Sequence, residues 1–258
     1  MKLGLCIGIN YDGQLGGCEN DAIKYSEMLA THMGFNNENI SVMLGKNATR
    51  KMIIKKWKEF AMITHRSYVE TLFISFSGHG TTQADSNGDE VDGVDEVIVP
   101  YDYASSGYIL DDEINGILKL VSERTTVVGV FDCCHSGTIF DLQYRYIQGD
   151  KSVYENSNAG IKAKCLMISG CKDSQVSGEV WVDNQVLGAL SAALFITLEE
   201  NEYTITCWNL LRKLRKRLNE AGYGFQVPQI TTSEKLHGTY PFIENIADEK
   251  PFLTCSSV

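Results

Sequence analysis

A histidine and a pair of cysteines follow two apolar segments of the chain, and these side chains could together perform nucleophilic chemistry. His79 lies between two glycines in SFSGHG, directly after the apolar letters LFI, and Cys133 and Cys134 lie in DCCHSG after VVGVF. A thiol becomes a strong nucleophile once a base removes its proton, and histidine is the most common such base. The sequence therefore predicts a nucleophilic cysteine that is assisted by a histidine.

Two alternatives compete with this interpretation of the cysteine pair. Both thiols could simply be buried in the core at the end of a strand. The two cysteines could also bind a metal together with His79 and His135. Neighbouring side chains of a strand point to opposite sides, and the chain contains no C-x-x-C pair, so the sequence disfavours the metal site.

Strand-like and helical segments alternate along the chain, which predicts an α/β fold with a mostly parallel central sheet and helices on both faces. Strands are expected at 3–9, 40–44, 69–80, 125–131, 164–169 and 226–233, and helices at 18–31, 47–63, 111–120, 186–198 and 206–222. Functional residues of such sheets collect at the carboxyl ends of the strands. Because the strands before His79 and Cys133 are expected to be neighbours, we predict that both residues belong to one site.

The segment 144–163 is polar and interrupts the strand pattern. It predicts an exposed linker between a larger part, 1–143, and a smaller part, 164–258. A second charged segment, 212–219, has bases around four leucines. We expect a solvated helix face over an apolar stripe there, with binding of an acidic partner as the alternative.

The composition limits the classes of partner and compartment. The chain of 258 residues carries 33 acidic and 23 basic residues, a net charge of −10, which disfavours non-specific nucleic-acid binding. No apolar segment has the length of a membrane span, and the apolar N-terminal segment is too short for a signal peptide. The eight cysteines are dispersed, as in proteins of a reducing compartment. We therefore expect a cytoplasmic protein that binds neither membranes nor nucleic acids.

Several ordered segments resemble those of the metacaspases, a family of the caspase-like clan of cysteine peptidases. They are GINYDGQLGGCENDA, SFSGHG, DGVDEVIVPYD, YILDDEI, VFDCCHSGT, ISGCKDSQVSGE, LGALSAAL and QVPQI, and they extend over nearly the whole chain. The resemblance implies a single caspase-like peptidase domain at 1–258, in a minimal form without an N-terminal prodomain. In this form 1–143 is similar to the large caspase subunit and 164–258 to the small one. It also implies a monomeric cysteine endopeptidase that acts on peptide or protein substrates through an acyl-enzyme.

The resemblance assigns roles to the residues of the two strand ends. His79 is implied to be the catalytic base, and Cys134, directly before His-Ser-Gly, the nucleophile. The backbone N–H groups of Gly80 and Cys134 are implied to bind the oxyanion. Cys133 is then a bystander, and His135 is not the base because it points away from the cysteine that it follows.

The implied substrate is cut after arginine or lysine, which requires acceptors in the pocket for the cationic side chain. The resemblance assigns this pocket to Cys18, Asp21, Ser77 and Asp132. A caspase specific for aspartate would need arginines, and neither strand-end segment contains one. In the alternative view Asp21 is an ordinary acid of a first helical turn and Asp132 caps the end of a strand.

The resemblance also implies a dependence on Ca²⁺. The residues implied to bind the ion are Asp95, Asp111, Asp112 and Asp141. Ligation by oxygen atoms alone suits Ca²⁺. The acidic segment 85–96 is not an EF-hand loop, because Glu90 stands where such a loop needs glycine. The competing hypothesis for the whole chain is a catalytically silent scaffold, or a calcium-responsive binding protein, with the same fold.

Overall fold

The central element of the computed structural model is an eight-stranded sheet. The structure describes residues 1–84, 94–137, 139–148, 151–154, 160–170, 178–236 and 240–243. The strands of the sheet are β1 (Lys2–Gly8), β2 (Ile40–Leu44), β3 (Thr71–Ser77), β7 (Thr126–Asp132), β8 (Tyr144–Gln148), β9 (Lys151–Tyr154), β10 (Lys164–Ser169) and β13 (Gln229–Thr232). They lie in the order β2-β1-β3-β7-β10-β13-β8-β9. The first five strands of this order are parallel, and β13, β8 and β9 each pair antiparallel with the strand before them.

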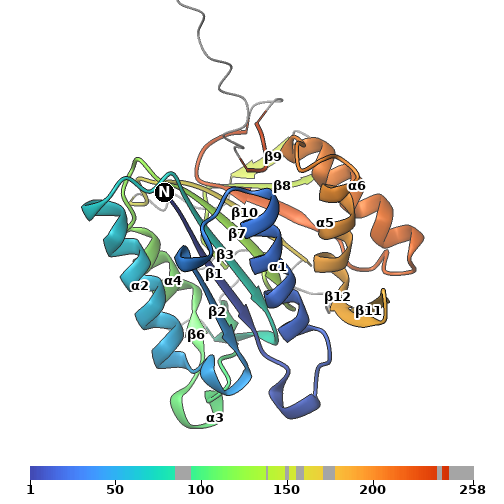
Figure 1. The fold of residues 1–258 in the computed structure, drawn as a ribbon, viewed down its shortest axis with the longest axis horizontal. Coiled ribbons are helices and arrows are strands. Elements are labelled where there is room, and N and C mark those ends of the chain that lie inside the picture. Colours follow the sequence, from blue (N-terminus) through green and yellow to red (C-terminus); the bar gives the residue numbers. More distant parts are fainter. Residues whose placement is uncertain are drawn as a thin grey trace, which may run out of the picture.

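Helices cover both faces of the sheet (Figure 1), as the strand and helix patterns predict. One face carries α2 (Arg50–Arg66) and α4 (Asp111–Leu118). The other carries α1 (Cys18–His32), α5 (Ala189–Glu199) and α6 (Cys207–Glu220). The caspase-like α/β fold is therefore confirmed.

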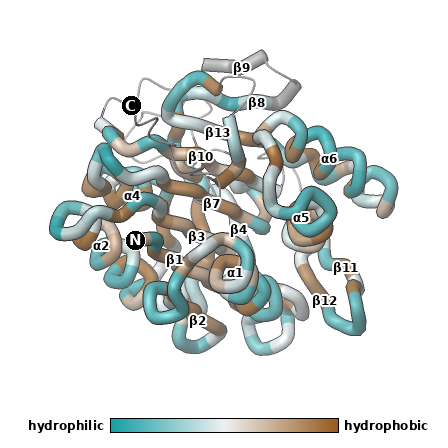
Figure 2. Tube along the Cα trace, turned by 45° about the horizontal axis from the view of Figure 1, so that its top comes forward, coloured by the Kyte–Doolittle hydropathy of each residue, from teal (hydrophilic) through white to brown (hydrophobic). Residues whose placement is uncertain are grey.

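The strands alternate between two hydrophobic cores, one on each face. In β3, Ile74 and Phe76 contribute to the core under α2 and α4, whereas Phe73 contributes to the core under α1, α5 and α6. In the next strand, β7, Val127 faces the first core and Val130 the second. The central strands are accordingly mostly apolar (Figure 2), as expected for a parallel sheet that is covered on both sides.

Short elements surround the carboxyl edge of the sheet. A three-stranded sheet consists of β4 (Gly80–Ala84), β5 (Val94–Ile98) and β6 (Ile109–Leu110), and a hairpin consists of β11 (Glu179–Val182) and β12 (Gln185–Gly188). The remaining helices are short: η1 (Tyr11–Gly13), η2 (Asn37–Asn39), η3 (Gly45–Asn47) and α3 (Tyr103–Ser106).

The segment predicted as an exposed linker contains two strands instead. β8 pairs with β13, and the ring of Tyr146 is fully buried against Trp208. The Tyr146 hydroxyl accepts a hydrogen bond from the backbone N–H of Leu236 at 2.7 Å. The segment resembles a loop in sequence because it is mostly polar. It forms a strand because β13 offers it an edge on which to pair.

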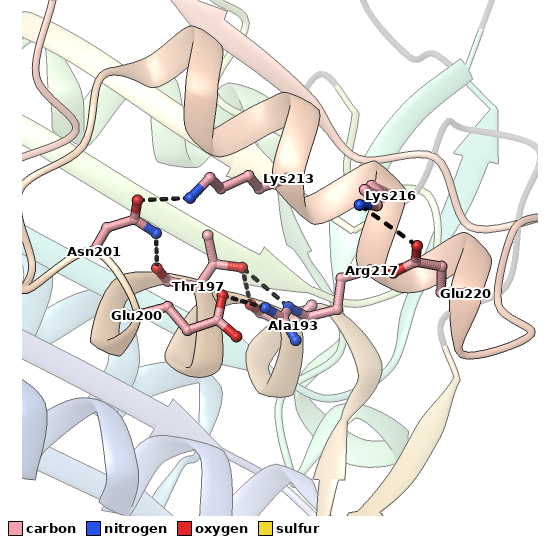
Figure 3. A network of polar contacts seen from close by, with 8 residues as sticks. All are labelled: Ala193, Thr197, Glu200, Asn201, Lys213, Lys216, Arg217 and Glu220. Atoms are coloured by element: carbon pink, nitrogen blue, oxygen red, sulfur yellow. Dashed lines mark hydrogen bonds and ion pairs between the residues drawn. The ribbon is translucent and has the colours of Figure 1, made fainter.

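The bases of α6 lie on a face that is partly exposed to solvent and partly paired within the protein (Figure 3). Lys213 donates to the side chain of Asn201 at 2.7 Å, and Arg217 lies 2.6 Å from Glu200, the residue that follows α5. Lys216 pairs with Glu220 on its own helix. The four leucines of the other face, Leu210, Leu211, Leu214 and Leu218, are buried, so the predicted apolar stripe is confirmed.

Within the described residues, no helix is long and apolar enough to cross a membrane.

Candidate active site

The two turns predicted to carry chemistry meet at the carboxyl edge of the sheet. The last residue of β3, Ser77, is opposite the last residue of β7, Asp132. The backbone N–H of Gly78 donates to the carbonyl oxygen of Asp132 at 3.4 Å. One residue past His79, the main chain at Gly80 runs so close to the carbonyl oxygen of Cys134 that a Cβ there would collide with it. The glycine is therefore required for the histidine turn and the cysteine turn to approach each other.

The two thiols occupy different environments. Cys133 is fully buried within the core, whereas Cys134 is partly exposed. The Ser136 hydroxyl donates to the carbonyl oxygen of Cys133 at 2.9 Å and so holds the turn that contains both cysteines. His135 adopts a left-handed backbone conformation, with φ of 50°. Solvent and substrate can therefore reach Cys134, but not Cys133.

His79 is held from one side by Tyr11, a residue of η1. The two rings lie 4.6 Å apart between centroids, and the Tyr11 hydroxyl accepts from the backbone N–H of His79 at 3.0 Å. The same hydroxyl donates to the carbonyl oxygen of Val99 at 2.5 Å. Burial lowers the pKa of His79 below its ordinary value of 6.5. The imidazole is therefore neutral at physiological pH and able to accept a proton.

Two buried carboxylates lie behind the cysteine turn. Asp21 comes from the first turn of α1, and Asp132 ends β7. The backbone N–H of Gly188 donates to both carboxylate oxygens of Asp21 at 3.1 Å. The backbone N–H and the hydroxyl of Ser191 both donate to the same oxygen of Asp132, Oδ2, at 2.9 Å. Asp132 thus accepts hydrogen bonds from the first turn of α5, which is a structural role at a helix start and differs from the strand-end cap of our alternative view.

The negative charges of this carboxylate pair repel each other, which raises the pKa values of nearby acidic groups. Burial, followed by the charge of Asp132, raises the pKa of Asp21 well above its ordinary value, although the side chain of Ser77 donates a hydrogen bond to it. The thiol of Cys18 has a raised pKa for the same reasons, first burial and then the charge of Asp21. The four residues predicted for the substrate pocket therefore lie close enough to interact. A cation placed among them would relieve the repulsion.

Sequence reasoning missed four residues of this region: Tyr11, Glu179, Gly188 and Ser191. The main chain at Gly188 packs against both Asp21 and Asp132, because a Cβ there would collide with Asp132 and lie 2.8 Å from Asp21 Oδ2. Each of the four residues acts on a partner far away in sequence. The segment LGALSAAL contains Gly188 and Ser191, so its likeness to the family was the one available signal for these two.

The four aspartates predicted to bind calcium are only partly brought together. Both carboxylate oxygens of Asp111 accept backbone hydrogen bonds, from Glu96 at 2.7 Å and from Asp112 at 2.8 Å. Burial, and to a lesser degree the charge of Asp95, raise the pKa of Asp111 to about 6. Asp141 is also buried.

Among the described residues, no three His, Cys, Asp or Glu side chains converge closely enough to hold a metal ion. The pair of Asp95 and Asp111 is buried and rich in oxygen donors, as a calcium ligand set must be, but the full set would need a rearrangement. Most of the acidic segment 85–96, its residues 85–93, lies outside the described residues.

The fold and the strand ends define a class of α/β proteins in which a histidine turn and a cysteine turn meet at neighbouring strands of a mostly parallel sheet. The family described as metacaspase, peptidase C14 domain, matches residues 2–143. Metacaspase-1 of Candida glabrata is 32% identical over 93% of this chain and 74% of its own length. Metacaspase-1B of Aspergillus oryzae is 30% identical over 93% of this chain and 69% of its own.

A crystal structure of a Geobacter sulfurreducens protein has the same fold. Its TM-score is 0.67 at 24% identity, and the match covers 92% of this chain and 94% of the other. The chain belongs to the metacaspases, which are a family of cysteine peptidases.

Proposed function

We propose that this metacaspase is a calcium-dependent endopeptidase that cuts after arginine or lysine, with Cys134 as nucleophile and His79 as base. The observation that carries the proposal is the position of the Asp21–Asp132 pair. It lies at the strand ends that also bear the accessible Cys134 and the neutral His79. A thiol, a base and a buried anionic pocket together suit attack on a peptide bond that follows a cationic residue.

In the proposed reaction, His79 removes the proton of the Cys134 thiol, and the thiolate attacks the carbonyl carbon of the scissile peptide. The backbone N–H groups of Gly80 and Cys134 would donate to the resulting oxyanion. The imidazolium then gives its proton to the leaving amine, which breaks the C–N bond and leaves an acyl-enzyme. His79 next removes a proton from a water molecule, and attack of this water releases the acid and regenerates the thiol.

The proposed specificity follows from the charge of the pocket. A guanidinium or ammonium group between Asp21 and Asp132 would compensate two carboxylates whose mutual repulsion raises the pKa of Asp21. Arginine offers planar donors that suit carboxylates, and lysine offers a compact point charge. Cys18 and Ser77 would form the remaining wall of the pocket.

We also propose that Asp95, Asp111, Asp112 and Asp141 hold Ca²⁺. The ion would neutralise the charge of the Asp95–Asp111 pair, and it supplies no step of the reaction. The loop that ends at Asp141 is already tied to α4, because the side chain of Asn115 donates to the carbonyl oxygen of Phe140 at 3.3 Å. Ordering this loop on binding would connect the ion to the cysteine turn that precedes it. A monomer in the cytoplasm is the proposed acting form.

A short reporter peptide that ends in arginine tests the assignment of the nucleophile. Cys134→Ala should abolish its cleavage in saturating calcium, whereas Cys133→Ala should keep most of it, because Cys133 is buried. Equal loss in both variants would contradict the assignment. A thiol-directed covalent probe with an arginine recognition group should label the wild-type chain at Cys134. Failure to label would favour the silent scaffold.

A further inference from the structure

A carboxylate outside the predicted site residues, that of Glu179, contacts the segment before α1 and acts through its charge on His79. Glu179 is the first residue of β11, and its Oε1 atom accepts hydrogen bonds from two consecutive backbone N–H groups. These are the N–H of Gly16 at 2.8 Å and that of Gly17 at 2.6 Å. The residues lie 163 and 162 positions away in the sequence. Charge-assisted hydrogen bonds of this length are stronger than those between neutral groups.

These bonds lie just before α1. Gly17 directly precedes the helix, and Cys18 and Asp21 lie in its first turn. Within that turn the N–H of Glu19 donates to Asn10 Oδ1 at 3.2 Å, so a different side chain caps the helix itself. The hairpin of β11 and β12 packs closely here, because a Cβ at Gly17 would lie 2.8 Å from the Cα of Leu187. Glu179 thus ties the two residues that lead into α1 to this hairpin, next to the helix turn that carries two predicted pocket residues.

The same carboxylate acts on the base. The charge of Glu179 raises the pKa of His79 and so opposes the larger lowering by burial. The elements that meet the His79 turn carry further titratable groups: Tyr11 and Asp12 on η1, Asp95 and Glu96 on β5, Asp132 on β7, and Cys133, Cys134 and His135 in the cysteine turn. Among the described residues, Glu179 is the charged group that shifts the pKa of His79. Burial raises the pKa of Tyr11, so that this neighbour stays neutral.

We propose that Glu179 is a positioning residue that anchors the segment leading into α1 through its hydrogen bonds to Gly16 and Gly17. Its carboxylate also contributes to the electrostatic surroundings of His79. The anchor keeps the pocket wall in place for a cationic substrate side chain. The charge stabilises the imidazolium that forms when His79 takes the proton of the thiol. The effect on catalysis rests on the function proposed above, whereas the effects on His79 and on the α1 start do not.

Glu179→Gln separates the two roles, because an amide oxygen still accepts hydrogen bonds but carries no charge. An NMR titration of His79, assigned with His79→Gln, should show a midpoint at lower pH in Glu179→Gln than in the wild type. Asp183→Asn is the matched control, since Asp183 is an exposed acid at the tip of the same hairpin, and it should leave the midpoint unchanged. An unchanged midpoint in Glu179→Gln would overturn the proposal.

Glu179→Ala tests the anchor. Amide hydrogen exchange at Gly16 and Gly17 should be faster in Glu179→Ala than in Glu179→Gln, and wild-type exchange in Glu179→Ala would overturn the proposal. With the arginine reporter, KM should rise about tenfold in Glu179→Ala, the size expected for loss of a charge-assisted hydrogen bond, and by less in Glu179→Gln. If the wild-type chain does not cleave the reporter, the proposed function fails, while the titration and the exchange still decide the role of Glu179.

Discussion

Two pairs of buried aspartates in the described part of the chain, Asp21 with Asp132 and Asp95 with Asp111, differ in what holds them. Asp21 and Asp132 come from α1 and β7, and backbone and hydroxyl donors of Gly188 and Ser191 fix them from a third region. Asp95 and Asp111 come from β5 and α4. The oxygens of Asp111 are satisfied by N–H groups of its own neighbourhood.

This difference separates a pair that is already held in place from a site that must be assembled. Burial and the charge of Asp132 raise the pKa of Asp21 well above its ordinary value, and burial together with the charge of Asp95 raises that of Asp111 to about 6. A cationic substrate side chain would meet carboxylates that Gly188 and Ser191 already fix. An ion at the second pair would have to draw further ligands together, since among the described residues no three such side chains converge. The predictions below test this contrast.

The largest effect is expected at the first pair. Asp132→Asn keeps an acceptor for Ser191 but removes the charge that would pair with the substrate cation. Loss of one partner of a buried charge pair predicts a decrease of about 100-fold in kcat/KM for the arginine reporter in saturating calcium. Glu19→Gln, in the same helical turn as Asp21, should have no comparable effect. A similar loss in both variants would mean that the pocket charge is not specific.

A smaller effect is expected at the second pair, and it should appear in a different quantity. Asp111→Asn removes a proposed calcium ligand, and affinity falls with the charge of the ligand set. The calcium concentration for half-maximal cleavage should rise about tenfold, a change of about 1.4 kcal/mol, while KM at saturating calcium stays near the wild-type value. Glu123→Gln, an exposed acid, serves as control. Unchanged calcium dependence in Asp111→Asn would remove Asp111 from the site.

The ionisation of Asp111, in the second pair, should make the stability of the protein depend on pH. The pKa of Asp111 is raised from 3.8 to about 6 by burial and by Asp95, so folding favours its protonated form. Its contribution to stability is complete below about pH 4 and is lost as the pH rises through about 6, with a slope of at most about 1.4 kcal/mol per pH unit. Urea unfolding with a calcium chelator measures this loss. It should be smaller in Asp111→Asn, and an identical pH dependence would contradict the raised pKa.

The smallest effect is a gain in stability at the pocket. Asp21→Asn removes one of two repelling buried charges, and the asparagine can still accept from Gly188. Without substrate, the free energy of unfolding at neutral pH should rise by about 1 kcal/mol, while cleavage of the arginine reporter falls, because stability and function conflict at such a pair. Thermal unfolding measures the first and the peptide assay the second. A less stable variant would show that the hydrogen bonds outweigh the repulsion.

Much of the fold could be predicted from local patterns. The adjacency of β3 and β7 follows from the tendency of successive strands to neighbour each other, and it places His79 and Cys134 at one edge. The strand β8 could not be predicted, because its pairing depends on β13, which lies far away in the sequence. The division of the chain into 1–143 and 164–258, and the oxyanion role of Gly80, stay predictions.

The pocket was assigned by likeness to a family. Glu179 and Ser191 lie in two of the segments that carry this likeness, ISGCKDSQVSGE and LGALSAAL, but the likeness gave neither residue a role. Glu179 contacts Gly16 and Gly17 across 163 and 162 positions, and Ser191 contacts Asp132 across 59. Such contacts depend on how the hairpin and α5 pack against α1 and β7.

The sequence by itself determined the class of fold, the nature of the two strand-end turns and the excess of acidic charge, because these depend on residue type and on spacing along the chain. The tertiary structure decided that Cys133 is buried and Cys134 accessible, that the carboxylates of Asp21 and Asp132 lie close enough to interact, and that Glu179 reaches the segment before α1. These outcomes depend on strand register and on packing between distant segments. Exposure, pKa and hydrogen bonding are properties of the surroundings, which the local sequence does not contain.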